Sequence, residues 1–163
     1  MRITRLNHAV LYVRDARRTA DFYRDVLGFT TVIEHEGGAF VFMRANASAN
    51  HHDIAFFSIG ATAGAPTTPR TVGMYHVAWE VPTLAELEEA RQRLTDAGAL
   101  VGASDHAVNK SLYAKDPDGL EFEVMWLTPP ESWGAEEHEA IVRPLDLPGE
   151  RSRFGDQLTA PGR

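Results

Sequence analysis

Three residues of this sequence have the types and positions expected of a divalent-metal site: His8, His76 and Glu123. Each histidine lies in a run of alternating residues, LNHAVLYV and MYHVAWEV, which is typical of a half-buried strand. Glu123 is a carboxylate inside an apolar run, where a charge needs a partner. Two imidazoles and one carboxylate that leave neighbouring coordination positions open form the facial triad of non-haem iron(II) oxygenases. We therefore expect one metal, Fe(II) with Mn(II) as the alternative, bound by these three residues.

A single strand histidine is more often a hydrogen-bonded structural residue than a metal ligand. Here the two histidines hold the same place in two copies of one pattern, and Val13 and Val81 repeat their spacing. Packing alone does not explain a repeat of this kind together with an acidic residue on the last strand of the second copy. The repeat therefore favours a metal site over the structural explanation.

The elements that must position these residues occur twice along the chain. In the first copy, Asp15 caps a helix that Gly28 ends, and Gly37-Gly38 predicts a hairpin turn that tolerates positive φ at both positions. The expected elements are a strand at 6–13, a helix at 16–27, and strands at 29–35, 39–44 and 52–59. In the second copy, Thr83 begins a helix that ends at Gly98, and strands are expected at 74–81, 99–101, 110–114 and 120–127.

The predicted fold class is α+β, with two tandem βαβββ modules that form a curled mixed sheet around the metal site and carry their helices on the outside. We expect a single domain over residues 1–127, made of module one at 3–60, a linker at 61–72 and module two at 73–127. Residues 128–163 would form a C-terminal extension, with a short helix near 135–142, that acts as a lid or a dimer clasp.

Composition excludes several classes of protein. The net charge of −7 and the scattered arginines predict no nucleic-acid partner. With no cysteine, the chain has no disulfide, thiolate metal site or cysteine nucleophile. The N-terminus lacks the pattern of a signal peptide, and no apolar run is long enough to span a membrane, so we expect a cytoplasmic protein without a membrane partner.

The motifs LNHAVLYV, MYHVAWEV and DPDGLEFEV resemble the vicinal-oxygen-chelate superfamily, which includes glyoxalase I, bleomycin-resistance proteins and type I extradiol dioxygenases. The resemblance covers about residues 3–127. In that superfamily the metal ligands lie on the first strand of each module and on the last strand. The resemblance therefore implies the same ligands, His8, His76 and Glu123, with Glu121 as the alternative to the carboxylate.

The last strand of module one separates the branches of this superfamily. Glyoxalase I has a fourth ligand there, usually a carboxylate, whereas the segment HHDIAFFSI holds no acid beyond Asp53. Three ligands leave the open coordination that ring cleavage needs. The segment also resembles the extradiol branch, which implies that His52, or its neighbour His51, is the acid–base residue beside bound oxygen. Tyr113 and His106 match further residues of that branch and are expected to hydrogen-bond the substrate oxygens.

The resemblance thus implies a one-domain, iron(II)-dependent extradiol dioxygenase that opens a catechol-type aromatic diol with O2. Its partners would be an aromatic vicinal diol, O2 and further copies of itself in a homodimer or higher homo-oligomer. The expected apolar walls are Val10, Phe56, Phe57, Met125 and Trp126. The alternatives are a glyoxalase-like lyase or isomerase, a metal-free drug-binding protein of the same fold, and a pseudo-symmetric scaffold for oligomerisation.

Overall fold

The computed structural model describes residues 1–66 and 71–156 in two compact units. The first unit contains Met1–Pro66 and the turn Asp116–Gly119, and the second contains the described residues of Thr67–Lys115 and Leu120–Arg163. The expected linker at 61–72 and the expected extension at 128–163 each fall partly outside the described residues. None of the helices within those residues is long and apolar enough to cross a membrane.

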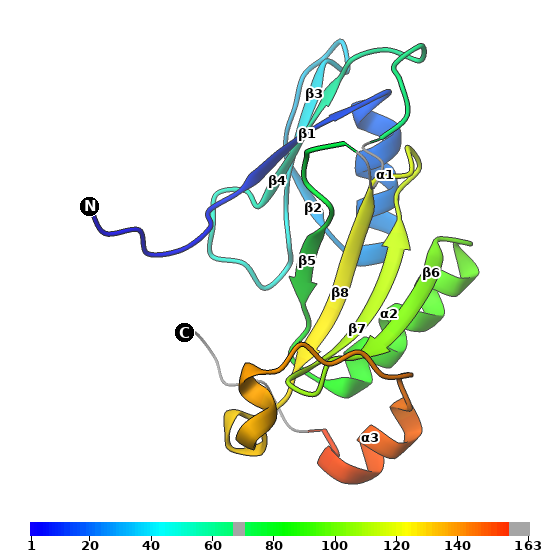
Figure 1. Ribbon diagram of the computed structural model, residues 1–163. Coiled ribbons are helices and arrows are strands. Elements are labelled where there is room, and N and C mark those ends of the chain that lie inside the picture. The colour runs from blue at the N-terminus through cyan, green and yellow to red at the C-terminus, as the bar shows by residue number, and fades with distance from the viewer. Residues whose placement is uncertain (67–70, 157–163) are drawn as a thin grey trace. The chain divides into compact units, whose positions relative to one another are not determined.

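The first unit consists of one helix and a four-stranded mixed sheet (Figure 1). Its elements are β1 (Ala9–Val13), α1 (Ala16–Leu27), β2 (Thr30–Glu34), β3 (Phe40–Arg44) and β4 (Ile54–Ser58). The strand order is β1-β4-β3-β2, in which β1 and β4 are parallel and the other pairs are antiparallel.

The second unit repeats this topology. Its elements are β5 (Val77–Glu80), α2 (Leu84–Asp96), β6 (Leu100–Asp105), β7 (Asn109–Lys115) and β8 (Glu121–Leu127), with strand order β5-β8-β7-β6. Again the first and last strands pair in parallel. The prediction of two βαβββ modules is therefore confirmed.

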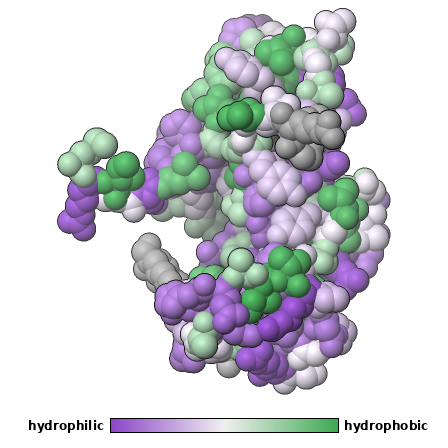
Figure 2. All heavy atoms as spheres, viewed as in Figure 1, coloured by the Kyte–Doolittle hydropathy of each residue, from purple (hydrophilic) through white to green (hydrophobic). Residues whose placement is uncertain are grey.

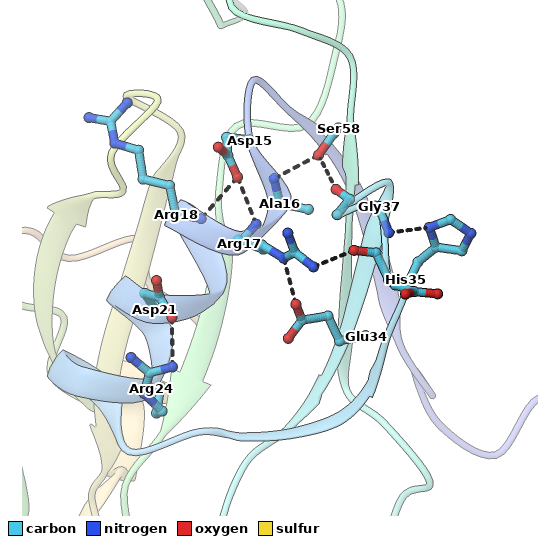
Figure 3. Close-up of polar contacts among 12 residues, drawn as sticks. Asp15, Ala16, Arg17, Arg18, Asp21, Arg24, Glu34, His35, Gly37 and Ser58 are labelled. Atoms are coloured by element: carbon cyan, nitrogen blue, oxygen red, sulfur yellow. Dashed lines mark hydrogen bonds and ion pairs between the residues drawn. The ribbon is translucent and has the colours of Figure 1, made fainter.

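Helix α1 begins and ends where the sequence predicts. The Asp15 carboxylate accepts hydrogen bonds from the amides of Arg17 and Arg18 at 2.9 and 3.1 Å (Figure 3). Gly28 adopts a left-handed conformation, with φ of 75°, and its amide donates to the last turn of the helix. These local contacts explain why the helix boundaries could be predicted from the sequence.

The hairpin between β2 and β3 lies where Gly37-Gly38 predicts it. The Gly38 amide donates to the His35 carbonyl at 2.7 Å, and Gly38 has a φ of 71°. Gly37 has no positive φ, so only one of the two glycines uses the left-handed conformation that both would tolerate. The Gly38 carbonyl accepts a hydrogen bond from the Ser58 hydroxyl, which itself accepts from the Ala16 amide at 2.8 Å. The hairpin is thereby linked to the start of α1.

Each sheet packs one face against its helix. The opposite face is not covered by that helix and is here called the helix-free face. In the first unit, alternate residues such as Val13 and Phe56 are buried together with Tyr23 of α1. In the second unit, Val124 and Trp126 are buried on the side of α2. The polar residues predicted to do chemistry therefore belong to the helix-free faces, because successive side chains of a strand point to opposite sides.

The two predicted metal-binding histidines lie one residue before their strands and not inside them. β1 begins at Ala9 because its parallel partner β4 begins at Ile54, and β5 begins at Val77. The expected strands at 6–13 and 74–81 are thus too long at their N-terminal ends. Residues 1–8 are exposed, and Figure 2 shows hydrophobic and hydrophilic residues mixed along this segment. Both histidines nevertheless keep equivalent places in the repeat.

The described part of the C-terminal extension, residues 128–156, contains more helices than the single short one expected near 135–142. It contains two short 3-10 helices, Pro130–Ser132 and Gly134–His138, and a third α-helix, α3 (Leu147–Phe154), that the sequence analysis missed. In Figure 1 the extension runs along the end of the sheet of the second unit. The Phe154 ring packs on Trp126 with ring centroids 5.3 Å apart. This part of the extension therefore belongs to the core of the second unit.

Candidate functional site

The helix-free face of the second sheet brings His76 and Glu123 together. Glu123 is the partner of Ala78 in the parallel β5–β8 pairing, two residues beyond His76. His76 Nε2 lies 3.1 Å from Glu123 Oε2. Glu123 is only 7% exposed, although Phe122 and Val124 on either side point into the core. A buried carboxylate is thus held beside an imidazole, as the sequence analysis expected.

The surroundings of this pair are compatible with a divalent cation. Within the described part of the chain, the contact of the second Glu123 oxygen is a long one, 3.5 Å from Asn109 Nδ2. Two ligand atoms that bind one metal at about 2.0–2.2 Å and at a right angle lie about 3 Å apart. The separation of His76 Nε2 and Glu123 Oε2 fits that spacing.

Tyr113 and His106 form a second pair on the same sheet. Tyr113 is the direct antiparallel partner of Glu123, so both side chains share the helix-free face, and its ring centroid lies 5.8 Å from that of His76. The Tyr113 hydroxyl lies 2.8 Å from His106 Nε2, and His106 Nδ1 lies 2.6 Å from the Ile141 carbonyl. Burial, and then the negative charge of Glu123, raise the pKa of Tyr113. Tyr113 is therefore a neutral phenol that can exchange hydrogen bonds with a ligand.

The predicted residues of the first unit form a separate group of rings. His8 and His52 have ring centroids 4.4 Å apart, and His52 stacks on Phe42 at 4.9 Å with an interplanar angle of 20°. His51 Nδ1 lies 3.0 Å from His52 Nδ1. Burial, and then the neighbouring His8 and His51 rings, lower the pKa of His52. The His52 ring is therefore disposed to be neutral near pH 7, in the form that can accept a proton.

Asp53, the acid nearest to His52, is committed to a structural role. It is buried, and its carboxylate accepts hydrogen bonds from the Ser48 hydroxyl, the Asn50 amide group and the Ala45 amide at 2.7, 2.7 and 2.9 Å. These contacts hold the loop that precedes β4. Asp53 thus does not provide a free carboxylate on the last strand of module one.

The structure brings the predicted site residues together as two groups, one in each unit. His8 and His52 lie in the first unit, whereas His76, Glu123, Tyr113 and His106 lie in the second. Within either unit, the described residues contain no cluster of three His, Asp or Glu side chains that could hold a metal alone. The three-ligand site therefore stays a prediction.

Several residues of the site were missed or wrongly placed by the sequence analysis. Asn109 shares the face of Tyr113, and strand alternation could have identified it. The Ile141 carbonyl had no signal in the sequence, since any residue carries one. Phe56 and Trp126 were expected as walls of the site, but both are completely buried on the helix side, so that expectation is wrong.

Of the two glutamates of β8, the structure favours Glu123 as the ligand. The alternative, Glu121, interacts with the Tyr75 hydroxyl, and this hydrogen bond is the main reason why the pKa of Tyr75 is raised. Glu121 thus already has a partner at the edge of the sheet.

Comparisons with known proteins identify the family of this chain. Residues 5–124 match the family described as the Glyoxalase/Bleomycin resistance protein/Dioxygenase superfamily. Biphenyl-2,3-diol 1,2-dioxygenase 3 of Rhodococcus globerulus is 34% identical over 132 residues, which cover 78% of this chain and 67% of that protein. Catechol-2,3-dioxygenase of Bacillus subtilis is 28% identical over 158 residues, which cover 94% of this chain and 53% of that protein. The chain thus spans about half to two thirds of the length of these relatives.

Solved structures show the same fold. The glyoxylase/bleomycin resistance protein/dioxygenase domain from Frankia sp. EAN1pec has a TM-score of 0.65 and 19% identity, and covers 77% of this chain and 99% of that chain. The structure described as a possible glyoxalase from Bacillus cereus has a TM-score of 0.58 and 26% identity, and covers 76% of this chain and 99% of that chain.

Proposed function

Because this chain belongs to the glyoxalase/bleomycin resistance protein/dioxygenase superfamily, we propose that it is an Fe(II)-dependent extradiol dioxygenase that cleaves a catechol-type aromatic diol with O2. The observation that carries this proposal is the row of His76, Glu123, Tyr113 and His106 on one face of the second sheet. The names of the relatives, a biphenyl-2,3-diol and a catechol dioxygenase, support a vicinal aromatic diol as the substrate class.

We assign His76 and Glu123 as two of the metal ligands and His8 as the third. The 3.1 Å separation of the first two supports their assignment. His8 is chosen because it lies immediately before β1, as His76 lies immediately before β5. The Asp53 carboxylate already accepts three hydrogen bonds, so it is not available as a fourth ligand from the β4 region. This supports a metal with open coordination positions over the four-ligand site of a glyoxalase-like lyase.

When bound, Fe(II) would supply the Lewis acidity that favours ionisation of the diol and the redox chemistry that reaction with O2 requires. His52 accepts a proton from the substrate and returns it after ring opening, which its neutral imidazole suits. Tyr113, supported by His106, hydrogen-bonds a substrate oxygen. Phe42 and Phe57, on the helix-free face of the first sheet, provide an apolar surface near His52.

Oxygen consumption tests the proposal directly. Protein loaded anaerobically with Fe(II) is expected to consume one O2 per diol when given catechol, 2,3-dihydroxybiphenyl or dihydroxyphenylalanine, and to form a coloured ring-opened product. Metal analysis should find about one iron per chain. Protein that binds stoichiometric iron but consumes no O2 with any of these diols would contradict the dioxygenase assignment. Protein that binds no iron would contradict the ligand assignment.

A further inference from the structure

The C-terminal extension reaches the pair of side chains that is proposed to hold the substrate. The family match ends at residue 124, and Ile141 lies beyond it. Its carbonyl oxygen is 2.6 Å from His106 Nδ1, and His106 Nε2 is 2.8 Å from the Tyr113 hydroxyl. A backbone atom of the extension is therefore connected, through the His106 side chain, to Tyr113 on the helix-free face of the sheet.

The chemistry of these contacts determines where the protons lie. A carbonyl oxygen can only accept a hydrogen bond, so His106 must carry its proton on Nδ1. In a neutral imidazole the other nitrogen is then an acceptor, and it takes the proton of the Tyr113 hydroxyl. The Ser111 side chain also hydrogen-bonds the Tyr113 oxygen, so one of its two lone pairs remains to accept a hydrogen bond from a ligand.

The extension is held in this position by backbone and ionic contacts. Arg143 and Asp105 form an antiparallel bridge, in which the Asp105 amide donates to the Arg143 carbonyl at 2.8 Å and the Arg143 amide donates to the Asp105 carbonyl at 2.9 Å. The Lys110 side chain is 1% exposed and contacts both the Asp105 carboxylate and Glu150 of α3, the latter at 3.3 Å. Ile141 thus lies two residues before an anchored point of the extension, and the second anchor, Glu150, follows further along the chain.

We propose that the extension sets the tautomer of His106 through the Ile141 carbonyl, and thereby makes the Tyr113 oxygen a hydrogen-bond acceptor for a hydroxyl group of the substrate. Ile141 and Arg143 act here as positioning residues. The inference rests on the proposed function for the identity of the ligand, a diol that keeps one hydroxyl proton. The proton arrangement itself depends only on the second unit.

Nitrogen NMR of histidine-labelled, metal-free protein tests the tautomer. At a pH where His106 is neutral, the wild-type protein should show a pyrrole-type signal for Nδ1 and a pyridine-type signal for Nε2 of His106, assigned by their loss in His106→Gln. The opposite pattern would overturn the inference, whatever the catalytic activity. Because this measurement uses neither metal nor diol, its failure is distinct from a failure of the proposed function.

Three variants show which group sets the tautomer. Arg143→Pro removes the amide that donates to Asp105, and it should shift His106 toward the Nε2–H form, whereas Arg143→Ala keeps the backbone bridge and should retain the wild-type signals. Tyr113→Phe should also retain them, since it leaves the Ile141 contact in place. A loss of the Nδ1–H form in Tyr113→Phe would overturn the inference by making Tyr113 the determinant. If Arg143→Pro does not fold, the wild-type and Tyr113→Phe spectra still decide.

Discussion

Glu123 is a buried charged residue whose two neighbours on β8, Phe122 and Val124, pack in the core. Among the residues that the structure describes, its nearest partner is His76 at 3.1 Å, followed by Asn109 at 3.5 Å. A carboxylate in this position is costly unless it is compensated. In the metal-free protein the His76 side chain offsets this cost. Under the proposed function, the metal would offset it.

Replacing Glu123 by Gln should weaken metal binding. The substitution keeps the size of the side chain and removes its charge. Residues that only support a metal ligand change metal affinity by roughly 10- to 100-fold when they are replaced, and the loss of a direct ligand should exceed that effect. Titration with Fe(II) or Mn(II) under anaerobic conditions measures the change. Glu121→Gln is the matched control and should bind metal like the wild-type protein. The reverse order of the two variants would identify Glu121 as the ligand.

Replacing His52 by Ala should separate metal binding from turnover. The His52 ring lies beside His8 but is assigned to proton transfer, which contributes about 10²- to 10⁴-fold to a rate. We expect the variant to retain one metal per chain and to lose kcat by a factor in that range. His51→Ala serves as the control, with turnover close to the wild-type value. Intact turnover in His52→Ala would exclude the acid–base role.

At the scale of elements, Lys110 connects β7 with the end of β6 and with α3. Its ammonium group is buried between Asp105 and Glu150. Burial by itself would raise the pKa of Asp105, but the hydrogen bond from Lys110, the Ala107 amide and the charge of Arg143 together lower it. A carboxyl group whose pKa is lower in the folded protein stabilises the fold above its unfolded pKa and loses this effect as the pH falls through its folded pKa.

Asp105→Asn should therefore destabilise the protein in a pH-dependent way. Near pH 7 the free energy of unfolding should fall by up to about 3 kcal/mol, because a buried ammonium loses one of its two partners. The difference from the wild-type protein should shrink below about pH 4, near the ordinary range of an aspartate. Urea unfolding at pH 7 and pH 3 measures both values. Glu136→Gln breaks an exposed ion pair with Arg143 and should cost less than about 1 kcal/mol. Equal losses at the two pH values would contradict the assignment.

The ends of α1 and of the β2–β3 hairpin offer two glycines for comparison. Gly28 has a φ of 75°, and an added Cβ would lie 3.3 Å from Asn46 Nδ2, whereas Gly37 has an ordinary φ. Gly28→Ala should lower the free energy of unfolding by about 1–2 kcal/mol, the cost of a left-handed residue with a Cβ. Gly37→Ala should be neutral or slightly stabilising. Thermal unfolding of both variants checks this, and a large loss of stability in Gly37→Ala would contradict the prediction.

At the scale of the whole molecule, binding of a metal to the folded chain should raise its stability. A ligand that binds only the folded state stabilises it by about 2.7 kcal/mol at 100 times its Kd. Anaerobic Fe(II) or Mn(II) should therefore raise Tm, and a chelator should reverse the increase. Mg²⁺, which prefers oxygen ligands, should have little effect. The increase should disappear in His8→Ala and in Glu123→Gln. An unchanged Tm in the wild-type protein with Fe(II) and with Mn(II) would contradict the metal site.

The sequence by itself determined the features that depend on neighbouring residues. The limits of α1 follow from Asp15 and Gly28, and the start of α2 follows from Thr83, whose side chain accepts from the Glu86 amide. The repeat of βαβββ follows from alternation and from the spacing of His8 and His76. Capping and periodicity act over a few residues, so they can be recognised without knowledge of the fold.

Only the tertiary structure decided which distant groups meet. Phe56 and Trp126 looked suitable as walls of a site, but helix packing places them in the core. The helix α3 was missed because its packing on Trp126 and its ion pair with Lys110 involve residues far apart in sequence. The contact of the Ile141 carbonyl with His106 is made by a backbone atom that every residue possesses. Such contacts depend on strand register and on the path of the extension, and neither is encoded in a local pattern.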